Sequence, residues 1–412
     1  MKKAVKLLGR VTKGLLWFVL AVFIIINLLI VLSGKFYIYN GVRYTYFRGR
    51  TGPGIYDLDL FAKRKIAKSK KAYILPHGEA YNKASLSIGD TRLLKDLDTK
   101  AFMVLKGDSV IFEHYYGGHT PQTVSNSFSA AKTVVGLLIA IAVEEGKIKS
   151  LDEPVGNYLP AYKEGDKVKI TIRHLLMMAS GLDWEESGAN PLSENAESYY
   201  GWDLRGLIDR QQLVDPPGKT FNYQSGNSQM LGLILEKATG KSVSEYTQEK
   251  LWKKIGTEHE AYWSLDDQNG VEKSFCCIYA TARDFARIGI LIHRGGKWRD
   301  EQVVPAWYMK ELTKPVKMAT QDGIPNFRYS LHVWNYLDKN ENITYCRGLM
   351  GQYIISMPKE DLIIVRLGSK RKDNIVMPQS NAGKKDKNLL KKVGHPAELF
   401  DYLRMARKIA KE

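Results

Sequence analysis

The chain has 412 residues and a formal net charge of +17, with 44% hydrophobic and 25% charged residues, a composition typical of a folded protein rather than a disordered one. The charge lies at the two ends: residues 1–72 contain 15 Lys or Arg and 2 acids, residues 366–412 contain 13 and 5, and residues 73–365 have a net charge of −4. A nucleic-acid-binding domain carries basic residues along its folded part, so the distribution excludes nucleic acid as the expected partner.

The first element is the apolar run Leu15–Leu32, which follows five basic residues and is interrupted only by Asn27. Its 18 residues are about the shortest stretch that spans a bilayer. A buried core helix and a cleaved signal peptide are the alternatives, but neither a small-x-small cleavage site nor a cysteine follows the run. We therefore expect residues 1–33 to be an uncleaved signal anchor. It would make the chain a single-pass protein of the cell (inner) membrane, with its folded part on the periplasmic side.

Residues 34–90 are rich in aromatic and basic side chains, including the run KRKIAKSKK at 63–71. Such a segment is expected to lie near the membrane and to contact anionic head groups. A solvated run of charges is the alternative. The folded domain is expected to begin between residues 72 and 91.

A β-hairpin is predicted at residues 101–117, where two apolar runs flank Gly107-Asp108. An apolar helix is predicted to follow, from about residue 130 to 145. Ser129 precedes this helix and Lys132 lies three positions later, so the two side chains share a face.

This pair could carry out catalysis, because a serine hydroxyl becomes a nucleophile when a base takes its proton. A lysine amine can be that base when burial lowers its pKa. The S-x-x-K pattern also occurs at Ser356 and Ser369, but no helix is predicted after either. Read alone, the segment fits a plain core helix with Ser129 as its N-cap equally well.

Residues 150–275 are predicted to be mainly helical and rich in loops. Within them, Tyr223-Gln224-Ser225 places two hydroxyls just before another apolar run. A tyrosine there could move a proton between nucleophile and leaving group, although an ordinary loop fits the same residues.

The remaining chain contains a helix predicted at 281–295, two short strands at 352–369 and a closing helix at 396–412. Strands at both ends of a helical insertion predict one α/β (α+β) domain over residues 91–412, with an all-α subdomain at about 150–275. Adjacent cysteines rarely bond each other, so Cys276 and Cys277 are not expected to pair. A bond from one of them to Cys346 is an alternative that no pattern supports, and the sequence predicts no disulfide framework. Neither cysteines nor histidines have metal-ligand spacing, so no metal or cofactor is expected.

Taken together, three motifs occur in a meaningful order: Ser-x-x-Lys, then Tyr-x-Ser, then a glycine-containing strand opening in RGLMGQYIISMP. This order resembles the serine β-lactamase and penicillin-binding-protein family. The sequence around the motifs is similar to the class C-related branch of this family, which includes esterases and 6-aminohexanoate-oligomer hydrolases. The resemblance covers roughly residues 95–410. It implies a β-lactamase/DD-peptidase-like fold, an antiparallel sheet flanked by helices.

By this resemblance Ser129 would be the acylated nucleophile, Lys132 its base and Tyr223 the proton relay. Ser225 would hold the lysine or the leaving group. The backbone N–H groups of Ser129 and Gln352 would form the oxyanion hole.

The third motif departs from the family pattern. The family has Lys-Thr-Gly or His-x-Gly there, whereas this chain has Leu349-Met350-Gly351. The family's cation helps to bind the carboxylate of β-lactams and D-alanyl peptides, and leucine cannot. Arg347, two residues earlier and hence expected on the same strand face, is a candidate substitute. Tyr199 and Tyr200 are further candidates for the pocket lining.

We therefore expect a membrane-anchored serine hydrolase that acts on small esters or amides, or on a peptide-like substrate. A penicillin-recognising β-lactamase or DD-peptidase is one alternative. A catalytically inactive binding or sensor domain on the same scaffold is the other.

Overall fold

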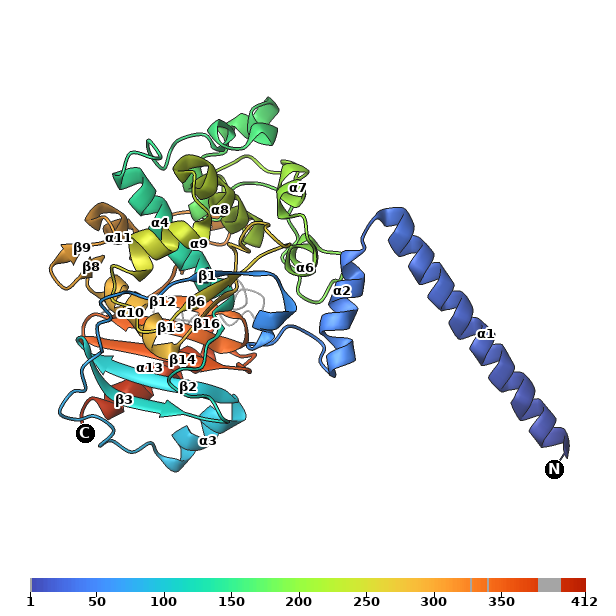
Figure 1. The fold of residues 1–412 in the computed structure, drawn as a ribbon, viewed down its shortest axis with the longest axis horizontal. Coiled ribbons are helices and arrows are strands. Elements are labelled where there is room, and N and C mark those ends of the chain that lie inside the picture. Colours follow the sequence, from blue (N-terminus) through green and yellow to red (C-terminus); the bar gives the residue numbers. More distant parts are fainter. Residues whose placement is uncertain (1, 327, 339–340, 377–393) are drawn as a thin grey trace.

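The computed structural model describes residues 2–326, 328–338, 341–376 and 394–412. Helix α1 (Lys2–Ser33) extends away from the rest of the molecule (Figure 1). Its segment Leu7–Ser33 is long and apolar enough to cross a membrane, and almost none of it is buried against the protein. An N-terminal apolar helix of this kind indicates secretory-pathway targeting or an anchor.

The centre of the molecule is a six-stranded antiparallel sheet in the order β11-β12-β13-β14-β2-β3. The predicted hairpin at 101–117 and the two predicted strands at 352–369 are confirmed as neighbours in it. Its strands are β2 (Thr99–Lys106), β3 (Ser109–Tyr115), β11 (Trp334–Asp338), β12 (Glu341–Gly348), β13 (Gln352–Met357) and β14 (Leu362–Gly368).

Helices cover both faces of this sheet. Helix α10 (Ala282–His293) packs on β13 and β14, where Ile354 and Ile363 belong to the larger apolar core. The alternate residues Ile355 and Ile364 face α13 (Ala397–Ile409) in a second core, as the two-residue period of a strand requires. The fold is thus an α/β fold with a large antiparallel sheet, as predicted.

A helical layer lies beyond α10 (Figure 1). Its central pair is α4 (Ala131–Glu144) against α8 (Ser225–Thr239). The other helices of this layer are α5 (Ile172–Leu176), α6 (Glu194–Tyr200), α7 (Leu204–Asp209), α9 (Val243–Thr247) and α11 (Ala306–Leu312). Helix α3 (Ile88–Asp96) lies apart from it, against β2 (Figure 1).

The segment 150–275, predicted to be all-α, contains two strands, the short β5 (Thr220–Phe221) and β6 (Ala261–Ser264). Strand β6 belongs to a four-stranded sheet in the order β1-β6-β7-β4. The partners are β1 (Lys63–Ile66), β7 (Ile278–Ala280) and β4 (Ser125–Asn126). The short strands β5 (Thr220–Phe221), β8 (Lys297–Trp298), β9 (Glu301–Gln302), β10 (Ala319–Thr320), β15 (Ile375–Val376) and β16 (His395–Pro396) form three two-stranded pairs.

The packed part of the chain begins well before the boundary expected between residues 72 and 91. Strand β1 pairs with β6 along its whole length, and α2 (Tyr37–Tyr44) packs on α6. Ile55 is 2% exposed, and its carbonyl accepts a hydrogen bond from the N–H of Asn126 (2.9 Å). The basic composition of this segment predicted a membrane-proximal or solvated stretch outside the fold. Several of its charges are instead paired within the structure, as in the ion pair of Arg50 with Asp57 (2.7 Å).

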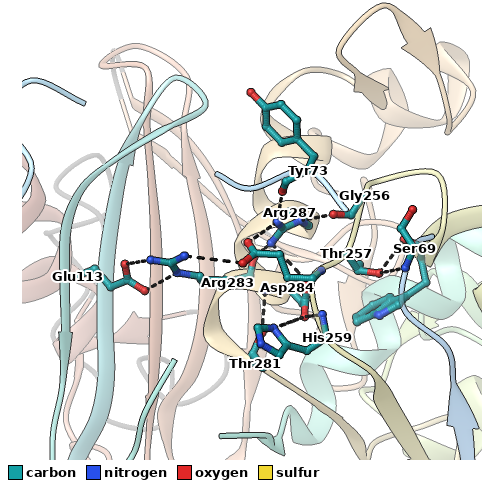
Figure 2. A network of polar contacts seen from close by, with 12 residues as sticks. Ser69, Tyr73, Glu113, Gly256, Thr257, His259, Thr281, Arg283, Asp284 and Arg287 are labelled. Atoms are coloured by element: carbon teal, nitrogen blue, oxygen red, sulfur yellow. Dashed lines mark hydrogen bonds and ion pairs between the residues drawn. The ribbon is translucent and has the colours of Figure 1, made fainter. Parts of the chain in front are cut away.

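A polar network fastens α10 to its surroundings (Figure 2). The Arg283 guanidinium donates two hydrogen bonds to Glu113 of β3 (2.8 and 2.7 Å). One turn later, fully buried Arg287 donates to the carbonyl of Tyr73 and forms an ion pair with Asp284 (3.3 Å). Buried charges are tolerated when they are paired and hydrogen-bonded, so this network joins the sheet, the helix and the entering chain.

Candidate active site

Ser129 lies in a 3₁₀ turn, Phe128–Ala130, immediately before α4. The serine hydroxyl does not cap that helix: the capping position is Ala130, and it makes no side-chain cap. Instead, the Oγ of Ser129 lies 3.3 Å from the Nζ of Lys132. The preceding Phe128 has a φ of 45°, an uncommon backbone conformation for a residue with a side chain. The plain N-cap interpretation of Ser129 is therefore wrong.

Lys132 is the centre of the polar cluster and is 1% exposed. Besides Ser129, its Nζ contacts the Oγ of Ser225 (3.0 Å) and the carbonyl oxygen of Phe275 (2.7 Å). Burial lowers the pKa of Lys132 to about 8, and the nearby Glu186 carboxylate acts in the opposite direction. A substantial fraction of this amine is thus neutral near pH 8 and able to accept a proton.

Tyr223 brings its ring to 5.3 Å from the Nζ of Lys132. The ring also packs against Tyr329 and Trp334, with centroids 5.7 and 5.5 Å away. Burial raises the pKa of Tyr223, and Glu186 raises it further, while Ser129 and Arg347 lower it. The phenol is therefore neutral at ordinary pH. The structure brings all four polar residues of the first two motifs together.

The third motif lies beside the serine turn. Gly348, the last residue of β12, faces the carbonyl of Ser127 so closely that a Cβ would lie 2.1 Å from that oxygen. Gly351 has a φ of +82°, which favours glycine, and Gln352 begins β13. The Gln352 amide donates to the carbonyls of Leu349 (2.9 Å) and Gly368 (2.6 Å). The Gln352 side chain is thus held inside the sheet. Only the backbone N–H of Gln352 is left for the expected role in the oxyanion hole.

A cavity of about 510 Å³ adjoins this cluster. Its lining includes Ser129, Glu186, Tyr199, Tyr200, Ser225 and Leu349. Leu349 is 41% exposed, and Tyr199 and Tyr200 come from α6. Of the four residues predicted to line the pocket, Leu349, Tyr199 and Tyr200 lie at this one cavity, and Arg347 does not.

Arg347 does not share the position of Leu349. Strand β12 ends at Gly348, so the two-residue alternation expected to place both side chains on one face stops before Leu349. The Arg347 guanidinium lies over the ring of Trp334, 5.7 Å from its centroid. The arginine that lines the cavity is Arg371, which the sequence did not single out because it lies in a basic run beyond the motif.

Three further features of the site were missed. Glu186 binds Ser225, and Pro53 of the N-terminal segment lines the cavity. A disulfide joins Cys276 to Cys277, against the expectation from their adjacency, and Cys276 lines the cavity next to Phe275. Of these features, only Glu186 could have been suspected from the sequence, because it is an acidic residue in the same loop region as Tyr199 and Tyr200. Within the described ranges, no group of three or more His, Cys, Asp or Glu could hold a metal ion.

Residues 92–382 match the family described as Beta-lactamase. The chain belongs to the beta-lactamase family. It is a serine hydrolase of that family, as the motif order predicted. Relatives of this protein include an amidase and esterases.

Among curated relatives, the 6-aminohexanoate-dimer hydrolase of Paenarthrobacter ureafaciens is 27% identical over 292 residues, which are 67% of this chain and 74% of the relative. The teichoic acid D-alanine hydrolase of Staphylococcus aureus (strain MRSA252) is 28% identical over 173 residues, 42% of this chain and 39% of the relative.

Two solved structures share the fold. A "Putative 6-aminohexanoate-dimer hydrolase from Bacillus anthracis" has a TM-score of 0.69 at 22% identity, covering 85% of this chain and 90% of its own. A family VIII carboxylesterase has a TM-score of 0.57 at 14% identity, covering 79% of this chain and 99% of its own.

Proposed function

We propose that the protein is a membrane-anchored hydrolase that cleaves small esters or amides through an acyl-enzyme on Ser129. The observation that supports this most is the position of the Lys132 Nζ, buried between the hydroxyls of Ser129 and Ser225 at the edge of a cavity. A neutral amine in hydrogen-bonding distance of a serine hydroxyl is the arrangement that activates a nucleophile.

In the proposed reaction the Oγ of Ser129 attacks the substrate carbonyl while its proton passes to the Nζ of Lys132. The bond to the leaving alcohol or amine then breaks, and that group takes the proton by way of Tyr223. Water hydrolyses the resulting ester of Ser129 by the same route in reverse. The backbone N–H groups of Ser129 and Gln352 are proposed to stabilise the oxyanion, since the third motif lies against the serine turn.

The preference for uncharged substrates rests on the cavity walls. Leu349 occupies the position where the family has a cation, and Tyr199 and Tyr200 add aromatic surface. Burying a carboxylate without a partner costs several kcal/mol. The names of the curated relatives, hydrolases of 6-aminohexanoate dimer and of teichoic acid D-alanine, support ester or amide bonds as targets.

The location is proposed from α1. We infer that this helix is an uncleaved anchor of the cell membrane and that the hydrolase acts on its outer, periplasmic side. Support comes from its length and apolar surface and from the five basic residues before Leu15.

A second candidate function has one observation in its favour. Arg371 lines the same cavity as Leu349 and could receive the carboxylate of a β-lactam or a D-alanyl peptide. This favours the penicillin-recognising alternative over the inactive scaffold.

The test is intact-mass analysis after a fluorophosphonate probe and, separately, after penicillin. We expect one phosphonate adduct, carried by the peptide that contains Ser129 and absent from Ser129→Ala, and no penicillin adduct. Labelling of Ser129→Ala to the same extent would reject the nucleophile. A stable penicillin adduct would favour the second candidate.

A further inference from the structure

Glu186 holds the start of helix α8 through both carboxylate oxygens. Its Oε1 accepts a hydrogen bond from the hydroxyl of Ser225 (2.6 Å), and its Oε2 accepts from the backbone N–H of the same residue (2.6 Å). The indole of Trp184 also donates to Oε2 (2.9 Å). Gly226 allows this approach, since a Cβ there would lie 2.4 Å from the Trp184 ring. The carboxylate is therefore fixed at the first turn of a 15-residue helix, where negative charge is favoured.

The hydrogen bonds determine which way the Ser225 hydroxyl points. A carboxylate can only accept, so the hydrogen of Ser225 is directed to Glu186. The Ser225 oxygen is left to accept from the Nζ of Lys132 (3.0 Å). The carbonyl of Phe275 also can only accept, and it takes a second Lys132 hydrogen (2.7 Å).

A neutral amine has two hydrogens and one lone pair. With both hydrogens of Lys132 donated to Ser225 and Phe275, the lone pair remains for its third neighbour, the hydroxyl of Ser129 at 3.3 Å. If Ser225 were free to rotate, its own hydrogen could point to that lone pair and compete with Ser129.

We propose that Glu186 is a positioning residue that locks the Ser225 hydroxyl as an acceptor, so that neutral Lys132 presents its lone pair to Ser129. This inference rests on the proposed function of Ser129 and Lys132. It assigns to Ser225 a defined orientation that depends on a residue outside the three motifs.

The electrostatic role of Glu186 gives a second readout. The Glu186 charge favours the protonated form of Lys132, so its removal moves the protonation midpoint of Lys132 to lower pH. The other titratable groups facing Lys132 are neutral near pH 7: burial raises the pKa of Tyr223 and lowers the pKa of His332 to about 3. A shift in the pH–rate profile therefore reports Lys132.

The experiment measures kcat and KM for p-nitrophenyl acetate against pH in Glu186→Gln, Ser225→Ala and the double variant. The matched control is Glu185→Gln, an exposed neighbour whose carboxylate oxygens bind Asn190 (3.0 and 2.9 Å). Thermal unfolding verifies that each variant is folded.

Glu186→Gln should lower kcat on the alkaline plateau by about 10-fold or more and shift the midpoint to lower pH, with Glu185→Gln unchanged. On that plateau, the same substitution should have little further effect in the Ser225→Ala background, because Glu186 acts through Ser225. The inference would be overturned if Glu186→Gln lowered kcat equally in the wild-type and the Ser225→Ala backgrounds. It would also be overturned if the pH–rate profile of Glu186→Gln were the same as that of the wild type. If instead Ser129→Ala kept its activity, the proposed function itself would fail.

Discussion

Two fully buried lysines, Lys132 and Lys273, show how little burial alone says about function. Burial lowers the pKa of Lys132 to about 8 and that of Lys273 to about 7. Lys132 has two serine hydroxyls and a carbonyl around its Nζ. Lys273 donates to the carbonyl of Tyr199 and lies over the ring of Phe61, 3.8 Å from its centroid. Only Lys132 has a hydroxyl to activate.

The pKa values alone would rank Lys273 as the more readily available base, and the neighbours reverse that ranking. A strongly shifted pKa marks a candidate functional group, but structural groups shift as well. Lys273 anchors the chain at Tyr199, a cavity-lining residue, whereas Lys132 contacts Ser129 itself.

The largest effect is expected from removing the N-terminal segment that supports Lys273. A chain of residues 73–412 lacks β1, Pro53 and Phe61, so β6 keeps β7 but loses β1, and Lys273 loses its contact with the Phe61 ring. We expect it to aggregate or to be inactive, whereas a chain of residues 34–412 should fold and hydrolyse p-nitrophenyl acetate. Solubility and kcat/KM of the two chains are the measurements. An active 73–412 chain would show that these contacts are dispensable.

The lysines themselves are compared by Lys132→Met and Lys273→Met, which remove the amine but keep most of the apolar stem. Lys132→Met should lower kcat by at least about 100-fold, the scale for losing a positioned general base. Lys273→Met should change kcat by less than about 3-fold, since its amine contacts no reacting group. Steady-state kinetics on folded protein decide this, and similar losses in the two variants would contradict the distinction.

The pH dependence should also separate the two residues. The value of kcat/KM should rise with pH and level off above about 8, as Lys132 loses its proton. A rate independent of pH from 5 to 9 would count against this base.

For stability, Lys273 binds more protons in the unfolded chain between its folded pKa of about 7 and its ordinary 10.5. Stability should therefore rise with pH across that window. In Lys273→Met this contribution disappears. The free energy of unfolding of the variant should therefore increase relative to that of the wild type below pH 7, and this increase should shrink as the pH rises towards 10.5. Urea unfolding of both proteins at pH 6 and pH 9.5 is the measurement, and a pH-independent difference would contradict it.

The smallest effect on activity is expected from introducing a third lysine at an exposed position of the cavity. Leu349→Lys puts an amine at a position that is 41% exposed, so burial should not lower its pKa as it lowers that of the two buried lysines. We expect the ratio of kcat/KM for a chromogenic cephalosporin to that for p-nitrophenyl acetate to rise several-fold. Arg371→Ala is the companion variant, because Arg371 already lines this cavity. A wild-type protein that prefers the cephalosporin would show that Leu349 was misinterpreted.

Much of the site was predictable from residue patterns. Ser129 and Lys132 are three apart before an apolar helix, so local geometry places them on one face and burial of the lysine follows from its neighbours. The hairpin at 101–117 and the strands predicted at 352–369 carry local turn and apolar signals, and both formed as predicted.

Tertiary structure alone decided the features that depend on distant segments. Glu186 reaches Ser225 from 39 residues away, and Phe275 reaches Lys132 from 143 residues away. The pairing of β1 with β6 joins residues about 200 apart, and the end of β12 at Gly348 separated Arg347 from Leu349. Such contacts leave no periodic trace in the sequence, because a hydrogen bond between remote residues constrains their chemistry but not their spacing.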